Sequence, residues 1–152
     1  MPPSVRVQLG AALGERAASG ADASTRRLMA RAARAALRHA GTRTAELSIT
    51  LLDDAGISAM NREFLAHDGP TDVISFALFG EGEDPVGDIY VGFDQAVRQA
   101  HENGVPISEE LARLAVHGTL HVLGHEHPEG KGRLESEMWQ AQEAIVAQVL
   151  HS

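Results

Sequence analysis

Short runs with alternating or β-branched residues predict four strands in this chain. SVRVQL, at residues 4–9, alternates apolar and polar positions, which is typical of a strand with one buried face. ELSITLLDD (46–54), DVISFALF (72–79) and GDIYVGF (87–93) are predicted as strands from their β-branched residues and flanking turn residues. GEGEDPV, between the last two, has the composition of a loop.

The remaining apolar residues recur with helical periodicity. The alanine-rich segment from Ser24 to Ala40 has an N-cap candidate at its start and Gly41 just past its end, so it is predicted as a helix. A short helix is predicted from the turn residues after the second strand to about Phe64. Three more helices are expected at about 93–103, 109–123 and 132–150.

This order of elements indicates an α+β fold, with a small mixed four-stranded sheet covered by about five helices. The strand order does not follow from the pattern. The chain shows no repeat and no long linker, so residues 1–152 are interpreted as one domain. In the last predicted helix, Met138 and Trp139 fall in an apolar pattern with Ile145 and Val149, and Met138 and Trp139 are predicted to lie in the core.

Composition narrows the possible chemistry. The chain has no cysteine, which excludes disulfides and thiolate metal sites and leaves histidine and carboxylate as metal ligands. Its N-terminus lacks a basic segment followed by a long apolar run, and no run reaches the roughly 18 apolar residues of a membrane span. We therefore expect a cytoplasmic protein with no membrane partner.

Charge is distributed unevenly along the chain. The net charge of -8 argues against binding to a polyanion, yet residues 1–43 carry eight arginines against Glu15 and Asp22, a balance of +6. The rest of the chain holds 5 basic and 19 acidic residues, or -14. The basic residues include a series at steps of four, three and four, opposite the apolar positions of one predicted helix: Arg27, Arg31, Arg34 and Arg38. These arginines form either a solvated face or a face that binds an RNA backbone.

Four of the eight histidines lie in HGTLHVLGHEH, residues 117–127. Ser108 is predicted to cap the helix that carries His117 and His121, and their spacing of four residues places both imidazoles on one face. Gly124 is expected to end the helix with a positive φ and to bring His127 towards the other two.

Three neutral imidazoles on one side of an ion leave a coordination position for water, as in catalytic zinc sites. We therefore expect one zinc ion bound by His117, His121 and His127, although nickel and copper also suit imidazole ligands. The alternative is a surface pair of histidines with no metal. The spacing is also that of zinc peptidases with an HExxH helix, but Gly118 replaces their catalytic glutamate, which argues against peptidase activity.

Three segments together resemble the YbeY family of bacterial metal-dependent single-strand endoribonucleases: HGTLHVLGHEHPEG, NREFLAHDGPTDVISF (61–76) and GDIYV (87–91). The family signature HGxLHLxGxxH is matched at every fixed position except Val122. The resemblance implies zinc ligands at His117, His121 and His127, and places the strand Pro70–Phe76 beside the metal. It also implies action in rRNA maturation and ribosome quality control, with single-stranded rRNA and the small ribosomal subunit or its proteins as partners, and no DNA.

One position departs from the family. Leu65 stands where many members carry an arginine to which contact with RNA phosphate is attributed. Arg62 and His67 are candidates to replace it. Asp72, a carboxylate within an apolar strand segment, is a candidate for the site or, equally, for a turn cap. No residue is assigned as general base.

The leading hypothesis is thus a zinc-dependent endoribonuclease acting on single-stranded rRNA. Two alternatives remain open. The first is a ribosome-assembly factor without catalytic activity, whose metal stabilises the fold and whose arginines dock on rRNA. The second is a metallohydrolase for a small substrate, which the acidic charge favours.

Overall fold

The computed structural model of the protein describes residues 3–14, 20–124 and 131–152, with backbone only over 131–136. Within these ranges, β1 (Ser4–Leu9), β2 (Glu46–Leu52), β3 (Val73–Ala77) and β4 (Val86–Gly92) form one sheet in the order β1-β2-β4-β3. β1, β2 and β4 are parallel neighbours, and β3 pairs antiparallel with β4 at the edge of this sheet. The prediction of a small mixed sheet is confirmed.

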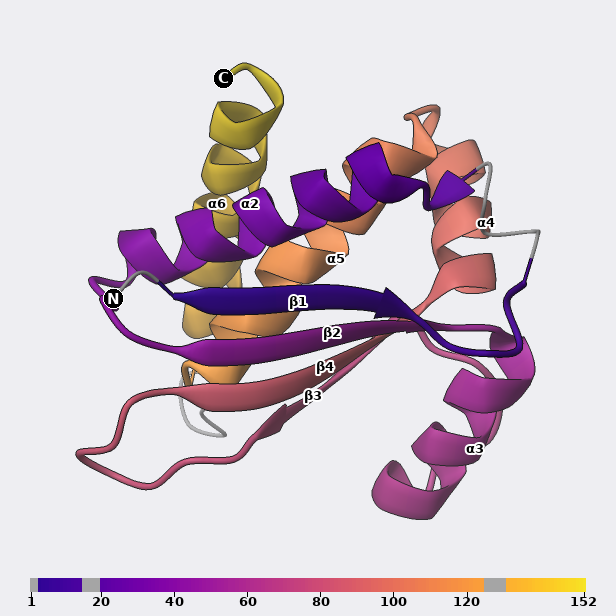
Figure 1. Cartoon of the computed structure of the whole chain (residues 1–152), viewed down its shortest axis with the longest axis horizontal. Coiled ribbons are helices and arrows are strands. Elements are labelled where there is room, and N and C mark those ends of the chain that lie inside the picture. Colours follow the sequence, from indigo (N-terminus) through magenta and orange to yellow (C-terminus); the bar gives the residue numbers. More distant parts are fainter. Residues whose placement is uncertain (1–2, 15–19, 125–130) are drawn as a thin grey trace.

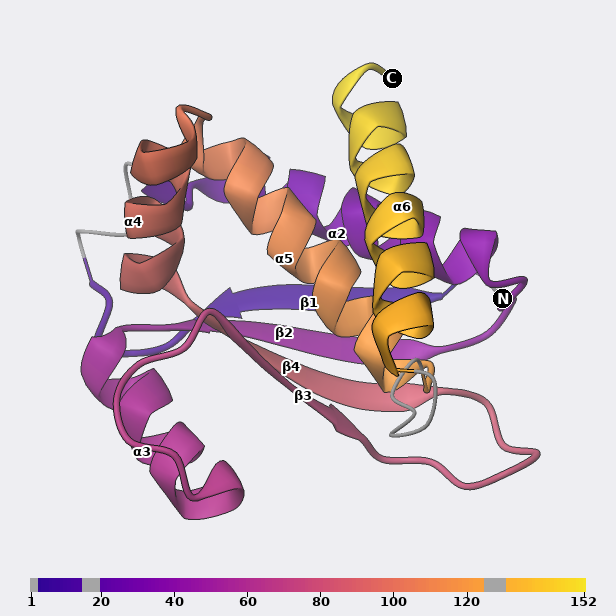
Figure 2. The ribbon, with the colours of Figure 1, turned by 180° about the vertical axis from the view of Figure 1, so that it is seen from behind.

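Five helices are described: α2 (Ala23–His39), α3 (Asp54–Leu65), α4 (Phe93–Asn103), α5 (Ile107–Val122) and α6 (Lys131–Leu150). α2 is the crossover between the parallel strands β1 and β2. α2, α5 and α6 lie on one side of the sheet, while α3 lies at one end on the other side (Figures 1 and 2). The predicted α+β fold is therefore correct.

α5 is the central helix of the helical layer, since it contacts α2, α4, α6, β3 and β4. The helix-facing side chains of β2 and β4, including Ile49, Leu51 and Ile89, are fully buried. Ala32, Ala33 and Ala36 of α2 are also fully buried, and these small side chains allow α2 to pack closely against α5.

Two helices begin earlier than the sequence predicts: α2 at Ala23 and α5 at Ile107. Asp22 caps α2 by accepting a 2.8 Å hydrogen bond from Thr25 N, and this bond lowers the pKa of the Asp22 carboxyl. The prediction that Ser108 caps α5 is wrong, because α5 begins at Ile107 with Pro106 in the cap position. The Pro106 carbonyl accepts from Glu109 N and Glu110 N, so Ser108 already lies in the first helical turn.

The prediction for the last helix is half correct. Met138, Ile145 and Val149 are buried, whereas Trp139 is 59% exposed. The buried positions of α6 are 138, 142, 145, 146 and 149, a single stripe at helical spacing. Trp139 lies about 100° around the helix from Met138, the angle between consecutive residues, and so at the edge of this stripe.

None of the helices in the described ranges combines the length and the apolar character that crossing a bilayer requires.

Candidate active site

α5 presents its two histidines as the sequence predicts. The rings of His117 and His121 lie on consecutive turns with centroids 4.5 Å apart and planes inclined by 54°. Both side chains are partly buried at the end of α5 nearest Val122. Two imidazoles are thus directed to the same side of one rigid element.

Gly118 explains why the HExxH pattern is broken. A Cβ at this position would lie 2.7 Å from Ile89 Cγ2 and 3.2 Å from Ser75 Oγ, so no side chain fits between α5 and the sheet. Ser75 Oγ also donates a 3.2 Å hydrogen bond to the Gly118 carbonyl. The residue after His117 therefore faces β3 and β4, and a glutamate there could not reach a substrate.

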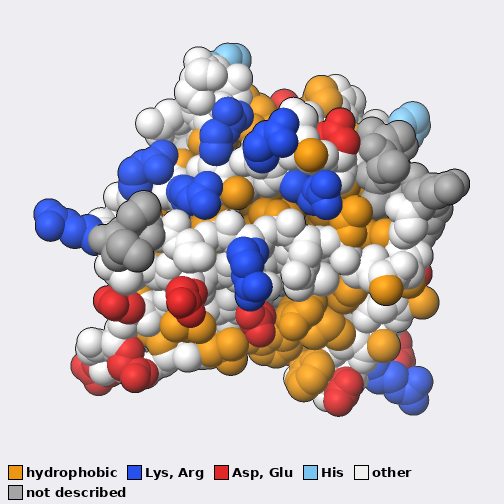
Figure 3. Space-filling model, viewed as in Figure 1, with side chains coloured by type: hydrophobic (Ala, Val, Ile, Leu, Met, Phe, Trp, Pro, Cys, Tyr) orange, Lys and Arg blue, Asp and Glu red, His pale blue; other side chains and the backbone are white. Residues whose placement is uncertain are grey.

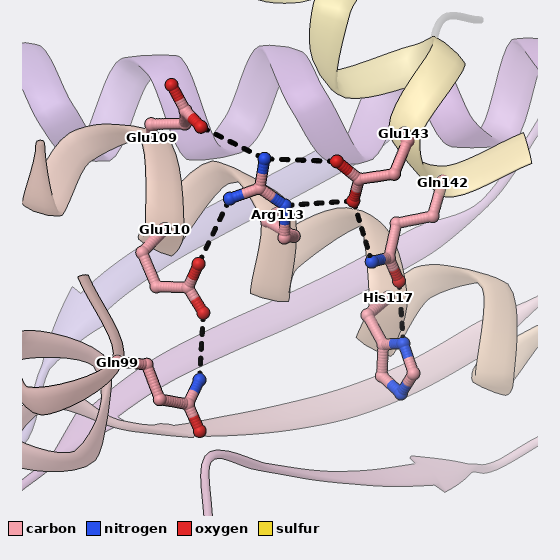
Figure 4. A network of polar contacts seen from close by, with 7 residues as sticks. All are labelled: Gln99, Glu109, Glu110, Arg113, His117, Gln142 and Glu143. Carbon is pink, nitrogen blue, oxygen red and sulfur yellow. Dashed lines mark hydrogen bonds and ion pairs between the residues drawn. The ribbon is translucent and has the colours of Figure 1, made fainter. Parts of the chain in front are cut away.

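A residue of α6 sets the orientation of the His117 ring (Figure 4). The Oε1 atom of Gln142, a side chain that is 3% exposed, lies 2.7 Å from His117 Nδ1. The amide nitrogen of Gln142 donates a 3.1 Å hydrogen bond to the Glu143 carboxylate, which can only accept when ionised. The amide oxygen therefore faces His117, so Nδ1 of the neutral ring carries the proton and Nε2 keeps its lone pair.

Burial keeps the His117 ring neutral. It lowers the pKa of His117 below the ordinary value, against the hydrogen bond with Gln142 and the charge of Asp72, which both raise it. A neutral imidazole with its Nδ1 proton donated and its Nε2 lone pair presented is the form in which histidine binds a metal.

The Gln142 amide is held by a cluster of charges centred on Arg113 (Figure 4). Arg113 donates to Glu143 at 2.8 and 3.1 Å, to Glu110 at 3.0 Å and to Glu109 at 3.0 Å. Burial disfavours the charged form of Arg113, but these hydrogen bonds outweigh it and raise its pKa. Gln99 donates a further 2.8 Å hydrogen bond to Glu110, which is 3% exposed. His117 is therefore linked through Gln142 and Glu143 to a rigid, partly buried ion cluster.

A cavity of about 430 Å³ lies beside His117. Asp72 lines it from the residue before β3, Trp139 and Gln142 from α6, and Leu114 from α5. Gln99 and Asn103 of α4 and Val105 complete the side away from α6. The sequence predicted His117 and Asp72 in the site, and the structure brings them to one cavity.

The sequence missed Arg113, Gln142, Glu143 and the role of Trp139. One signal was present in the pattern: Gln142 is a polar residue at a position of the α6 stripe that is otherwise apolar. Arg113 also follows Glu109 by four residues and precedes His117 by four, on one face of α5.

The predicted glycine turn is present. Gly124 has φ +94°, and its N–H donates to the His121 carbonyl at 3.0 Å, directly after the helix. His127, the predicted third ligand, lies outside the described residues. Among the residues that the structure describes, no three histidine or acidic side chains are grouped so that they could hold a metal ion.

The two candidates for the missing phosphate contact lie elsewhere. Arg62 is exposed near the end of α3 and His67 is exposed just after it. Neither is among the described residues that line the cavity beside His117. Leu65 is also exposed, at 46%.

The arginines of α2 form the single face that the sequence predicts. Arg27, Arg31 and Arg38 are exposed, while Ala32, Ala36 and Leu37 on the opposite face are fully buried. Figure 3 shows this face as a band of basic side chains over α2. Arg34 is partly buried and donates a 3.3 Å hydrogen bond to the Pro3 carbonyl, so it also holds the N-terminal segment. No ion pair joins any of these four arginines to another residue of the described ranges.

The fold and the site define a class of protein: an α+β domain that presents an oriented, neutral histidine beside an open cavity. Comparison with known proteins specifies the family. The family model described as endoribonuclease YbeY matches residues 15–150. The chain belongs to the endoribonuclease YbeY family.

Individual relatives agree with this assignment. An endoribonuclease YbeY of Moorella thermoacetica is 46% identical over 116 residues, covering 69% of this chain and 73% of the relative. That of Geobacter sulfurreducens is 38% identical over 134 residues, covering 84% and 87%. The solution structure of TM1509 from Thermotoga maritima is similar with a TM-score of 0.61 and 25% identity, covering 95% of this chain and 88% of that one. The curated relatives are named endoribonucleases, which are hydrolases.

Proposed function

We propose that this protein is a zinc-dependent endoribonuclease that cuts single-stranded RNA, with rRNA of the small ribosomal subunit as its substrate. We further propose that it acts in the cytoplasm, in rRNA maturation and ribosome quality control. The observation that carries the activity is the oriented His117 ring beside a cavity, in a chain of an endoribonuclease family.

The donor set fits a zinc ion. His117 presents Nε2 because Gln142 occupies Nδ1, and His121 stands one turn further along the same face. We assign the third position to His127, after the turn at Gly124. Bound zinc would polarise the scissile phosphate or activate water near neutral pH. Nickel and copper suit the same ligands.

Gly118 stands where an HExxH helix has its catalytic glutamate, so another group must transfer the proton. Three carboxylates line the cavity: Asp72, Glu110 and Glu143. Arg113 holds Glu110 and Glu143 by direct hydrogen bonds, whereas Asp72 makes no side-chain hydrogen bond with a described residue. Asp72 is therefore our candidate to accept or donate a proton at the reacting phosphate.

Arg27, Arg31, Arg34 and Arg38 are proposed to dock the RNA backbone away from the site. A guanidinium group without a carboxylate partner is available for phosphate, and this face is the basic part of an otherwise acidic chain. α2 is in front in Figure 1, whereas α4, α5 and α6, which line the cavity, are in front in Figure 2. This separation also favours the second candidate function, a ribosome-assembly factor that binds rRNA without cutting it.

The deciding experiment compares cleavage with binding. Purified protein is incubated with single-stranded RNA, double-stranded RNA and a chromogenic ester, with and without chelator. We expect cleavage of the single strand alone, abolished by chelator, by His117→Ala and by His121→Ala, with RNA binding largely kept. Metal analysis after dialysis should give close to one equivalent, lost in His121→Ala. RNA binding without cleavage under every metal condition would favour the assembly factor, and hydrolysis of the ester alone would favour a small substrate.

A further inference from the structure

Trp139 is an exposed aromatic side chain beside the candidate active site. It is the chain's one tryptophan, and 59% of it is exposed although its neighbour Met138 is buried. Single exposed apolar side chains are common on protein surfaces, so the position of Trp139 is more informative than its exposure. Trp139 lines the same cavity as His117, so a ligand of the site is the natural partner of this ring.

The position of Trp139 on α6 fixes its relation to His117. Trp139, Gln142 and Glu143 are three and four residues apart, so they share one helix face with side chains roughly 5–6 Å from one another. Gln142 is the residue that binds His117 Nδ1 at 2.7 Å. A flat group stacked on Trp139 would therefore lie about one helical turn from the residue that orients His117.

The lining of the cavity selects against phosphate. The cation that lines it, Arg113, is engaged by Glu109, Glu110 and Glu143. No other lysine or arginine of the described ranges lines the cavity, and Asp72 adds a negative charge. A phosphate group would meet three carboxylates and no available cation, so a neutral group is favoured.

The same lining suits a nucleobase. Leu114 and Val105 provide apolar surface, and the Asn103 amide makes no side-chain hydrogen bond with a described residue. An amide offers one acceptor and two donors, which match the edge of a base. A volume of about 430 Å³ leaves room for a base and its ribose.

We infer that this cavity is a nucleobase subsite, in which an unpaired base of the RNA stacks on Trp139 and is bound at its edge by Asn103. The inference rests on the proposed function, since it identifies part of the substrate of the same site. A base stacked on Trp139 would leave the adjoining phosphate to the part of the cavity that His117 and Asp72 line. A base in a duplex cannot enter, so the subsite would also explain a preference for single strands.

The test uses the full chain with chelator present, so that binding is measured without cleavage. Short oligoadenylate should quench the Trp139 fluorescence, while a ribose-phosphate oligomer without bases should not. Affinity of the variants is measured by the anisotropy of a labelled oligonucleotide. Trp139→Ala should weaken binding roughly 5- to 150-fold, the loss expected for one stacked base, and Trp139→Phe should restore most of it.

Two controls separate stacking from a general loss of surface. Leu78→Ala removes another exposed apolar side chain, 55% exposed and outside the cavity lining, and should bind like wild type. Asn103→Leu should keep the fluorescence quenching but reduce discrimination among oligoadenylate, oligocytidylate and oligouridylate. Circular dichroism verifies that each variant is folded.

The inference is overturned if Trp139→Ala binds oligoadenylate as tightly as wild type, or if the base-free oligomer quenches equally well. If Trp139 instead binds a partner protein, Trp139→Ala should bind oligoadenylate as tightly as wild type and no oligonucleotide should quench the fluorescence. These outcomes are independent of the nuclease assay: cleavage with no quenching rejects the subsite alone, and quenching without cleavage rejects the catalytic function alone.

Discussion

Arg113→Met is the change that most directly tests the ion cluster behind His117. Methionine keeps the apolar stem of the side chain but removes the guanidinium that Glu109, Glu110 and Glu143 share. The side chains of these carboxylates are 23%, 5% and 32% exposed, respectively. Glu109 and Glu143 can turn towards water, whereas Glu110 is left buried with Gln99 as its remaining partner.

The size of the effect follows from that buried carboxylate. Removing one partner of a buried ion pair costs about 3–5 kcal/mol because the other charge stays desolvated. This is a large part of the roughly 5–15 kcal/mol by which a domain of this kind is stable. For a chain of 152 residues it corresponds to a fall in Tm of roughly 6–20 °C.

The same substitution at Arg98 is a matched control. Arg98 also binds a carboxylate, Asp54, at 2.9 and 3.0 Å, but the two side chains are 45% and 41% exposed. Solvent screens this pair, so Arg98→Met should unfold close to the wild-type temperature. Differential scanning calorimetry of the three proteins at neutral pH measures the contrast. Equal values for the two variants would show that the Arg113 cluster contributes no more than a surface pair.

The pH dependence of the unfolding temperature provides a second test of the ion cluster. Burial would raise the pKa of Glu143, but its hydrogen bond from Arg113 outweighs this and lowers the pKa below the ordinary value. The stability that comes from this lowered pKa is present above the ordinary pKa and is lost as the pH falls through the lowered one. The difference in Tm between wild type and Arg113→Met should therefore shrink in acid.

Two further predictions concern the third ligand and the arginine face. Gly124→Val should be strained at φ +94° and lose metal affinity, whereas Gly41→Val, equally open and at φ +76° after α2, should lose stability alone; competition with a chromogenic chelator distinguishes them. Unchanged metal affinity in Gly124→Val would show that this turn does not deliver His127. Replacing Arg31 and Arg38 by glutamine should weaken RNA binding and leave the metal content unchanged. The slope of log affinity against log salt concentration should become shallower by about 0.7 per lost phosphate contact. An unaltered slope would mean that the face is only solvated.

The elements of the fold were predictable because each is specified locally. The alternation in Ser4–Leu9 and the spacing of buried residues in α2 are properties of neighbouring positions, and both elements appear at the predicted places. The helix start at Pro106 was mispredicted because Ser108, two residues later, has the capping side chain that Pro106 lacks. The strand order depends on which strands pair across the chain, and no local pattern records that.

The site divides in the same way. His117, His121 and Gly124 belong to one helix and the turn after it, so their spacing alone predicted the ring pair and the positive φ. Gln142 and Trp139 are 25 and 22 residues beyond His117, on a helix whose rotation is set by its packing against α5. The apolar pattern predicted Trp139 in the core. Trp139 instead lies at the edge of the buried stripe of α6, where its side chain lines the cavity.

Gly118 shows how packing limits the chemistry available to a histidine pair. In an HExxH helix the position after the first histidine supplies the general base, but here that position contacts Ile89 and Ser75 and admits no side chain. The close approach of α5 to the sheet brings His117 near the edge strand β3 and to the same cavity as Asp72. Any carboxylate that moves a proton must therefore come from another position, and Arg113 already holds Glu110 and Glu143. Asp72, at the start of the edge strand, is the cavity carboxylate that this packing leaves available, which is why the site depends on the antiparallel pairing of β3 as well as on the histidine helix.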